Sequence, residues 1–175
     1  MRLFQKVSNS YSYLRNWRVL QARPVLLIAL VLPVQAWSAD VSDLPAPLQK
    51  IVNEAAQTCA EFDNGEFALD WGSVQRADLD GDLQSDWILN DSGFSCSNAA
   101  SLYCGTGGCM SHFLIGENLN SLLNQGWEVV TFGPHRVLLA DVHGSDCGGI
   151  NPTPCTVASI WDPEERVWRS TTANW

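Results

Sequence analysis

The chain has 175 residues and a formal net charge of −9, from 19 Asp and Glu against 10 Lys and Arg. All 19 carboxylates lie in residues 40–175, where only five basic residues oppose them, so that region has a net charge of −14. A surface that binds nucleic acid must be basic to meet the phosphates, so this charge argues against nucleic acid as a partner.

Residues 1–36 are predicted to be a cleaved signal peptide. A basic stretch that ends at Arg23 is followed by the apolar run PVLLIALVLPV at residues 24–34, and small residues follow at Ala36, Ser38 and Ala39. The alternative is an uncleaved membrane anchor, but the run has about half of the roughly 20 apolar residues that a spanning helix needs. We therefore expect a periplasmic or secreted protein with no stable membrane insertion after cleavage, and one globular domain over residues 37–175.

The mature chain is predicted to begin with a helix over residues 47–61. Apolar residues recur there at helical spacing, at Leu48, Ile51, Val52, Ala55 and Cys59. Cys59 lies on this apolar face, so a disulfide from it would fasten the helix to the rest of the fold.

After Gly65 the chain is predicted to form strands and turns. Short apolar or alternating runs bounded by Gly, Asn, Asp or Pro occupy residues 67–71, 87–89, 112–115, 127–132, 137–142 and 157–161. Residues 161–168 are typical of a hairpin with Trp on both arms. Residues 118–125 are predicted to be a helical turn or a long loop. The predicted fold class is α+β, with the N-terminal helix packed on a twisted, mostly antiparallel sheet.

The six cysteines are predicted to form disulfides, because their number is even and the expected compartment is oxidising: Cys59, Cys96, Cys104, Cys109, Cys147 and Cys155. Six cysteines allow 15 pairings, and sequence alone leaves the choice open. Local geometry favours Cys104–Cys109 across a glycine-rich turn and Cys147–Cys155 across a short loop, which leaves the first two for each other. The competing hypothesis is a zinc site formed by Cys104, Cys109 and His112.

The strongest functional signal is the acidic segment DLDGDLQSD at residues 78–86. Carboxylates stand at its positions 1, 3, 5 and 9, and a backbone carbonyl is available at position 7, so the predicted ligands are Asp78, Asp80, Asp82, Gln84 and Asp86. Calcium takes six to eight oxygen ligands, and a cation would relieve the repulsion among these carboxylates. An EF-hand is excluded because its bidentate Glu at position 12 is Leu89 here.

The alternative is an acidic turn without an ion, since Asp and Gly favour turns in any case. If calcium binds, we expect a structural role, because a turn that saturates its metal with protein oxygens leaves no open position for a substrate.

The acidic segment resembles the Asp-x-Asp-Gly-Asp-Gly-x-x-Asp calcium turn that joins two strands in FG-GAP-type repeats. It departs from that pattern at Leu83, which replaces the second glycine of the motif, a position where the backbone often needs an angle that only glycine adopts at low cost. With the Cys-Gly-x-x-Gly-Cys loop at 104–109, the segment DVHGSDCGG at 141–149 and the closing Trp-Asp hairpin, residues 45–170 are similar to a group of uncharacterised small secreted proteins of Gram-negative bacteria. The resemblance implies a fold and an export route and no activity.

The leading functional hypothesis is an exported periplasmic, non-enzymatic protein in which calcium stabilises one hairpin and whose protein or envelope partner is unknown. An alternative is a periplasmic inhibitor of, or immunity protein against, a basic hydrolase such as lysozyme, because the charge of −14 would steer it toward a cationic partner. A second alternative is a hydrolase that uses His143 and Ser145, with Asp141 or Asp146 nearby. Their order matches neither the trypsin-like pattern nor Gly-x-Ser-x-Gly, so no catalytic residue is assigned.

Overall fold

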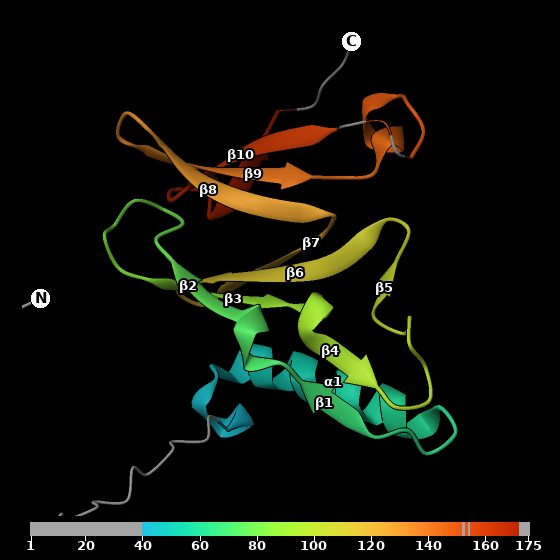
Figure 1. The fold of residues 1–175 in the computed structure, drawn as a ribbon. Helices are drawn as coiled ribbons and strands as arrows, with labels where there is room; N and C mark the ends of the chain where they lie inside the picture. Colours follow the sequence, from blue (N-terminus) through green and yellow to red (C-terminus); the bar gives the residue numbers. More distant parts are fainter. Residues whose placement is uncertain (1–39, 152, 154, 172–175) are drawn as a thin grey trace, which may run out of the picture. The chain divides into compact units, whose positions relative to one another are not determined.

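The computed structural model describes residues 40–151, 153 and 155–171, and the predicted signal peptide, residues 1–36, lies outside them. One α-helix and eleven strands follow in chain order within this part of the chain (Figure 1): α1 (Ala46–Glu61), β1 (Phe67–Leu69), β2 (Val74–Ala77), β3 (Asp86–Asn90), β4 (Phe94–Cys96), β5 (Cys104–Gly105), β6 (Gly108–Ile115), β7 (Asn118–Asn124), β8 (Gly126–Phe132), β9 (His135–Asp141), β10 (Thr156–Asp162) and β11 (Val167–Ser170). Short 3-10 helices lie between some of them: η1 (Val41–Asp43), η2 (Trp71–Ser73), η3 (Asp91–Gly93) and η4 (Gly144–Cys147).

The helix α1 begins after Pro45 and has Pro47 in its first turn, where the missing N–H would have had no partner in the helix. Its buried residues Leu48, Val52 and Cys59 lie on one face, at the helical spacing that the sequence predicts. Leu48 and Val52 belong to the same buried cluster as Leu89 of β3 and Leu114 of β6.

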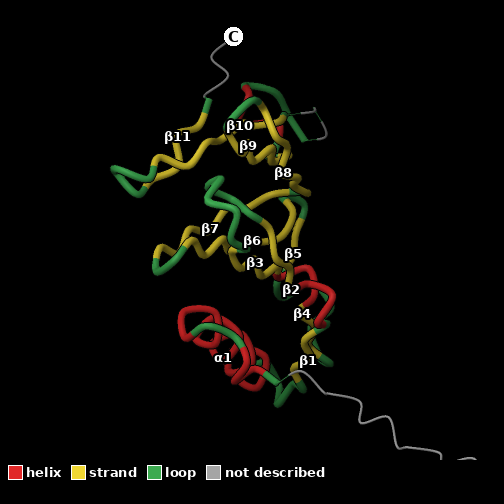
Figure 2. Tube along the Cα trace, turned by 90° about the vertical axis from the view of Figure 1, so that its left-hand side faces the viewer, coloured by secondary structure: helices red, strands yellow, loops and turns green. Residues whose placement is uncertain are grey.

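The strands form two larger antiparallel sheets and a small two-stranded ribbon of β1 and β4. One sheet has the order β2-β3-β6-β5, with β7 also paired to β6, and the other has the order β11-β10-β9-β8. A second buried cluster contains residues of both sheets: Leu79, Ile88, Phe113, Ile115, Leu138 and Trp161. Figures 1 and 2 show the two sheets stacked, with α1 beside the sheet of β3 and β6.

Strands β3 and β6 are buried on both faces. Successive residues of a strand point to opposite faces, so Leu89 enters the cluster with α1 while its neighbour Ile88 enters the cluster between the two sheets. Leu114 and Phe113 of β6 divide in the same way. These strands therefore form the central layer, which is why they read as continuous apolar runs in the sequence.

The α+β class and the antiparallel pairing are confirmed, although strands dominate the fold. The hairpin at 161–168 is also confirmed, with Trp161 opposite Trp168. The prediction for residues 118–125 is wrong, because Asn118–Asn124 is the strand β7. The turn Gly116-Glu117 folds the chain directly back onto β6, and Gly116 takes a positive φ of 56° there.

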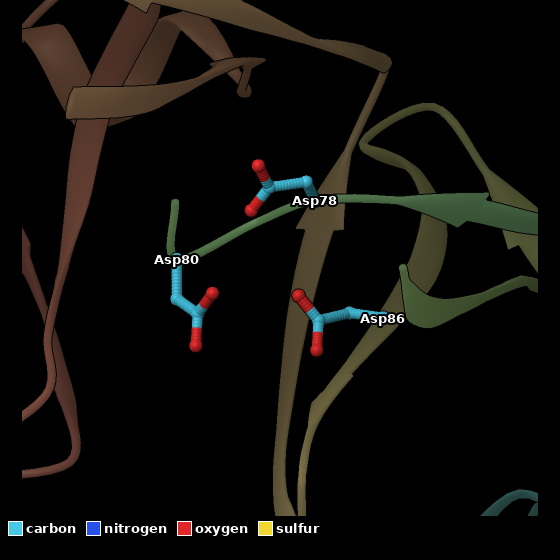
Figure 3. A group of neighbouring side chains, drawn as sticks. All are labelled: Asp78, Asp80 and Asp86. Carbon is cyan, nitrogen blue, oxygen red and sulfur yellow. The ribbon is translucent and has the colours of Figure 1, made fainter. Parts of the chain in front are cut away.

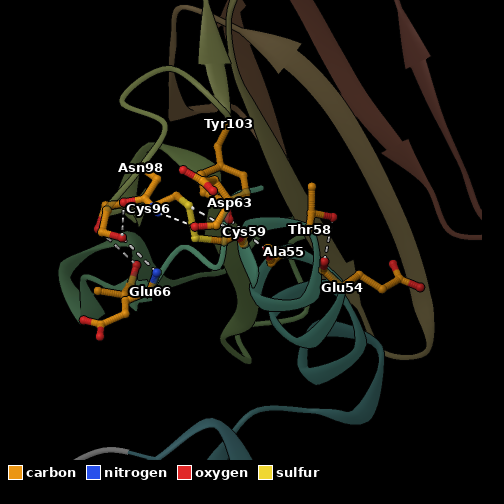
Figure 4. Close-up of a disulfide and its surroundings, with 12 residues drawn as sticks. Glu54, Ala55, Thr58, Cys59, Asp63, Glu66, Cys96, Asn98 and Tyr103 are labelled. Atoms are coloured by element: carbon orange, nitrogen blue, oxygen red, sulfur yellow. Dashed lines mark hydrogen bonds between the residues drawn. A yellow bond between two sulfur atoms is a disulfide. The ribbon is translucent and has the colours of Figure 1, made fainter. Parts of the chain in front are cut away.

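Two of the three disulfides join the pairs that local geometry favours, the third joins the two cysteines that remained, and the described residues contain no free cysteine. Cys59–Cys96 fastens α1 to β4 (Figure 4), Cys104–Cys109 links β5 to β6, and Cys147–Cys155 closes the loop before β10. Disulfides of this number indicate an oxidising compartment. Within the described part of the chain, every helix is too short or too polar to cross a bilayer.

Candidate metal site

The acidic segment is the loop that joins β2 to β3. The two strands are antiparallel and Ala77 is paired with Asp86, so the loop leaves and re-enters the sheet at neighbouring positions. Leu79, which is 1% exposed, anchors the loop in the cluster between the two sheets. Arg76 of β2 donates hydrogen bonds to the backbone carbonyls of Ser85 and Asp86 and lies 4.0 Å from the ring centroid of Trp87.

The carboxylates shape the loop by accepting hydrogen bonds from its own backbone N–H groups. Four such bonds of 2.6–3.0 Å are present: Gly81 to Asp78, Asp82 to Asp80, Gln84 to Asp82, and Leu79 to Asp86. Turns of this kind are typical of Asp followed closely by small or polar residues. The loop conformation is thus set largely by the carboxylates that were predicted as ligands.

Three of the five predicted ligands have carboxylate oxygens within 4.8 Å of one another: Asp78, Asp80 and Asp86. Figure 3 shows the carboxylates of Asp80 and Asp86 facing one another, with Asp78 beside them at the start of the loop. Asp82 is outside this group, and its second oxygen accepts a hydrogen bond of 2.7 Å from the side-chain amide of Gln84. A cation at the three carboxylates would therefore meet oxygen ligands of the kind that calcium prefers.

The electrostatics of the group disfavour three charged carboxylates. The pKa of Asp86 is raised from 3.8 to about 6, mainly by burial and also by the charges of Asp80, Asp82 and Asp78, while the hydrogen bond from the Leu79 N–H opposes the change. The metal-free loop thus holds a carboxylate whose ionised form is less stable than that of an unperturbed Asp side chain.

Asp78 has a cationic neighbour that sequence reasoning missed. The guanidinium Nη2 of Arg136 in β9 lies 2.9 Å from Asp78 Oδ2, and both side chains are mostly buried. The contact is an ion pair without hydrogen-bond geometry, because Asp78 Oδ2 is buried and accepts no hydrogen bond. Asp78 lies in the β2–β3 loop and Arg136 in a strand of the other sheet, far apart in the sequence, so no local pattern could have linked them.

Leu83 occupies the position where the related motif has glycine, and it has a positive φ of 68°. The side chain is 84% exposed and packs against little. A left-handed conformation costs a non-glycine residue roughly 1–2 kcal/mol. Leu83 thus has a backbone conformation that glycine would adopt at lower cost.

A groove of about 640 Å³ opens beside the loop. Its lining includes Asp80, Asp82 and Asp86 from the loop, Glu117 from the β6–β7 turn, and Trp87 and Trp161. Solvent and ions can thus reach the carboxylates of Asp80 and Asp86 from this groove.

The zinc hypothesis is wrong, because Cys104 and Cys109 are joined in a disulfide and provide no thiolates. The imidazole of His112 is instead hydrogen-bonded to Asp91 and Ser121. His143 Nδ1 is 2.7 Å from Ser145 Oγ at the start of η4. The nearby Asp141 accepts a hydrogen bond from Thr156, so the His143–Ser145 pair has no carboxylate partner among the hydrogen bonds of the described residues.

The chain matches no protein-family model, no curated protein and no solved structure.

Proposed function

We propose that this chain is an exported periplasmic protein, held together by three disulfides, whose β2–β3 loop binds calcium in a structural and non-enzymatic role. Export would remove residues 1–36 and leave one α+β domain with its helix packed on the central sheet. The observation that carries the calcium proposal is the meeting of the Asp78, Asp80 and Asp86 carboxylates within 4.8 Å. Its protein or envelope partner is unknown.

The residues present fit a hard divalent cation. The three clustered carboxylates would supply anionic oxygens, and the predicted set adds Asp82 and the backbone carbonyl of Gln84. The ion would stabilise the ionised form of Asp86, whose pKa is raised by burial and by the neighbouring carboxylates, and would compete with Arg136 for Asp78. A cation held by Asp78, Asp80 and Asp86 would tie the two ends of the loop together, where β2 ends and β3 begins.

The test is the melting temperature of the oxidised protein in EDTA and in ~1 mM calcium, at matched ionic strength. Calcium at a hundredfold excess over its dissociation constant adds about 2.7 kcal/mol, which for a domain of this size corresponds to a rise on the order of 10 °C. Asp80→Asn should abolish the rise, whereas Asp146→Asn, an exposed carboxylate outside the loop, should leave it unchanged. A rise that survives in Asp80→Asn, or an equal rise with magnesium, would contradict the proposal.

The groove gives specific support to a second candidate function, that of an inhibitor or immunity protein against a basic hydrolase such as lysozyme. Asp80, Asp82, Asp86 and Glu117 bring four carboxylates to one concave surface, and acidic surfaces steer cationic partners. Lysozyme activity should fall when the protein is added at micromolar concentration. Unchanged lysozyme activity would count against that partner.

A further inference from the structure

Away from the acidic loop, three side chains on β6, on β7 and directly after β3 are connected by two consecutive hydrogen bonds. Asp91 Oδ1 lies 3.0 Å from His112 Nε2, and His112 Nδ1 lies 2.7 Å from Ser121 Oγ. Asp91 follows β3, His112 is in the middle of β6, and Ser121 is its cross-strand partner on β7. Carboxylate, imidazole and hydroxyl are thus connected in the order that activates a serine nucleophile.

The hydrogen-bond partners of His112 determine which of its ring nitrogens carries the proton. An ionised carboxylate only accepts, so Nε2 of neutral His112 must carry the proton and donate it to Asp91. Nδ1 is then unprotonated and accepts the hydrogen bond of the Ser121 hydroxyl. This tautomer has a free base directed at the serine, which a general base requires.

The three hydrogen-bonded side chains differ in burial in the way that catalysis needs, with a buried base and an exposed nucleophile. The side chains of His112 and Asp91 are 9% and 13% exposed, whereas Ser121 is on the surface. The base is thus shielded from competing water, while the nucleophile can be reached by a substrate.

The open edge of β7 supplies a further donor. Ile115 and Asn118 flank the two-residue turn. The pair that closes a two-residue hairpin is a hydrogen-bonded one, and hydrogen-bonded pairs alternate with non-hydrogen-bonded pairs along an antiparallel ladder. The His112–Ser121 pair therefore has no ladder hydrogen bonds, and the backbone N–H of Ser121 points away from β6. Within the described residues, β7 pairs with β6 alone, so this N–H is available to an incoming oxygen.

We propose that Asp91, His112 and Ser121 form a serine-hydrolase site for carboxylic esters with a short apolar acyl group. Ser121 Oγ attacks the ester carbonyl carbon and its proton passes to His112 Nδ1, while the Ser121 N–H binds the developing oxyanion. The alkoxide leaves with the proton of His112, and an acyl-Ser121 ester remains. Water, deprotonated by the same Nδ1, then releases the carboxylic acid and restores the serine hydroxyl.

The substrate class follows from the neighbours of Ser121 on β7. Leu119 and Leu123 lie two residues to either side, on the same face of the strand, and are 38% and 48% exposed. They offer apolar contact to an acyl chain next to the nucleophile. The proposal goes beyond the calcium site, does not depend on it, and departs from the expectation of a non-enzymatic protein.

The test uses the oxidised protein, purified from an oxidising compartment of the expression host, with 4-nitrophenyl butyrate and a fluorophosphonate probe. We expect hydrolysis above that of the heat-denatured protein and one phosphonate adduct, which peptide mapping places on Ser121. Ser121→Ala changes an exposed residue and should abolish both signals. Ser145→Ala removes the other serine bonded to a histidine and should change neither.

The roles of His112 and Asp91 are tested by separate measurements. His112→Gln should lower the labelling rate by about 10²-fold or more, the range for a general base. Asp91 acts through His112 as a positioning residue, so Asp91→Asn should lower kcat for the ester while KM stays unchanged. Circular dichroism and the melting temperature identify any variant that fails to fold.

Three results would overturn the proposal: no adduct on Ser121 of the folded wild-type protein, an adduct on Ser145 instead, or ester hydrolysis that is equal in Ser121→Ala and wild type. All assays are run in EDTA as well as in calcium, so that failure of the calcium site and failure of the serine site are distinguished.

Discussion

The carboxylate of Asp86 accepts a hydrogen bond that holds the loop and, at the same time, carries a charge that the loop disfavours. Because its pKa is about 6 in the folded protein and 3.8 for an unperturbed Asp side chain, the folded state binds more protons than the unfolded state between these values. The free energy of unfolding of the metal-free protein should therefore decrease as the pH rises from about 4 to about 6. Calcium binding should weaken as the pH falls below 6, since the ligand must be deprotonated.

Asp86→Asn should raise the melting temperature of the metal-free protein at pH 7. It should also remove the decrease in stability that the wild-type protein shows as the pH rises from about 4 to about 6. The amide retains an oxygen for the Leu79 N–H and removes the unfavourable charge. The measurement is thermal unfolding in EDTA across this pH range. Asp162→Asn is the matched control, with the opposite expected effect on stability. The hydrogen bond from Arg169 lowers the pKa of the Asp162 carboxyl, so removal of this charged carboxylate should reduce stability at pH 7. A lower melting temperature of Asp86→Asn at pH 7 would contradict the assignment.

Some residues at the β2–β3 loop could be assigned a role from the sequence, and others could not. The spacing of the aspartates predicted a cluster because alternate residues of a tight turn point the same way. The sequence indicated a position at Leu83 where glycine would be favoured, and Leu83 has a positive φ of 68°. Arg136 was missed because an ion pair between two sheets leaves no periodic signal in the chain.

Strand β7 shows why a short element can escape prediction. Its sequence, NLNSLLN, contains three Asn residues, which are depleted in strands, and its side chains alternate only weakly between apolar and polar. The strand forms because the preceding turn reverses the chain beside β6. The Asp91–His112–Ser121 chain was missed for the same reason, since it depends on a cross-strand pair that sequence spacing does not predict.

The pairing of β6 with β7 depends on Gly108, at the start of β6. It has a positive φ of 104°, and a Cβ at this position would overlap the carbonyl oxygen of Asn124. Gly108→Ala should therefore destabilise the protein by about 2 kcal/mol or more. Gly105→Ala in the same Cys104–Cys109 loop is the control, because a Cβ there meets no atom within 4 Å, and its effect should stay within about 0.5 kcal/mol. Urea unfolding midpoints measure both, and equal midpoints would contradict this role of Gly108.

At the scale of the whole molecule, the class and the covalent framework were predictable and the layering was not. A helix with an apolar face followed by short strands predicts the α+β class. A signal-like leader followed by a region with an even number of cysteines predicts disulfides. The division of the strands into two sheets was not predictable, because Ile88 and Leu89 are both apolar and the sequence does not say which cluster each one enters.

The disulfides should differ in their contribution to stability according to the length of chain that each one closes. The Cys59–Cys96 bond has a sequence separation of 37 and Cys104–Cys109 has one of 5. Loop-entropy arguments give about 4 kcal/mol for the first and about 2 kcal/mol for the second. Replacing each pair by Ala and comparing the free energies of unfolding tests this order. A larger loss from the short loop would show that native-state contacts outweigh the constraint on the unfolded chain.

All three disulfides join cysteines that are consecutive in the chain: the first with the second, the third with the fourth and the fifth with the sixth. A polypeptide that emerges from a membrane with its N-terminus first exposes each cysteine directly before or after its correct partner. An oxidant that joins thiols in their order of appearance would then produce the native set without an incorrect bond to break. If the chain is exported as proposed, this pattern of bonds would let a thiol oxidase alone produce the native set, without a disulfide isomerase.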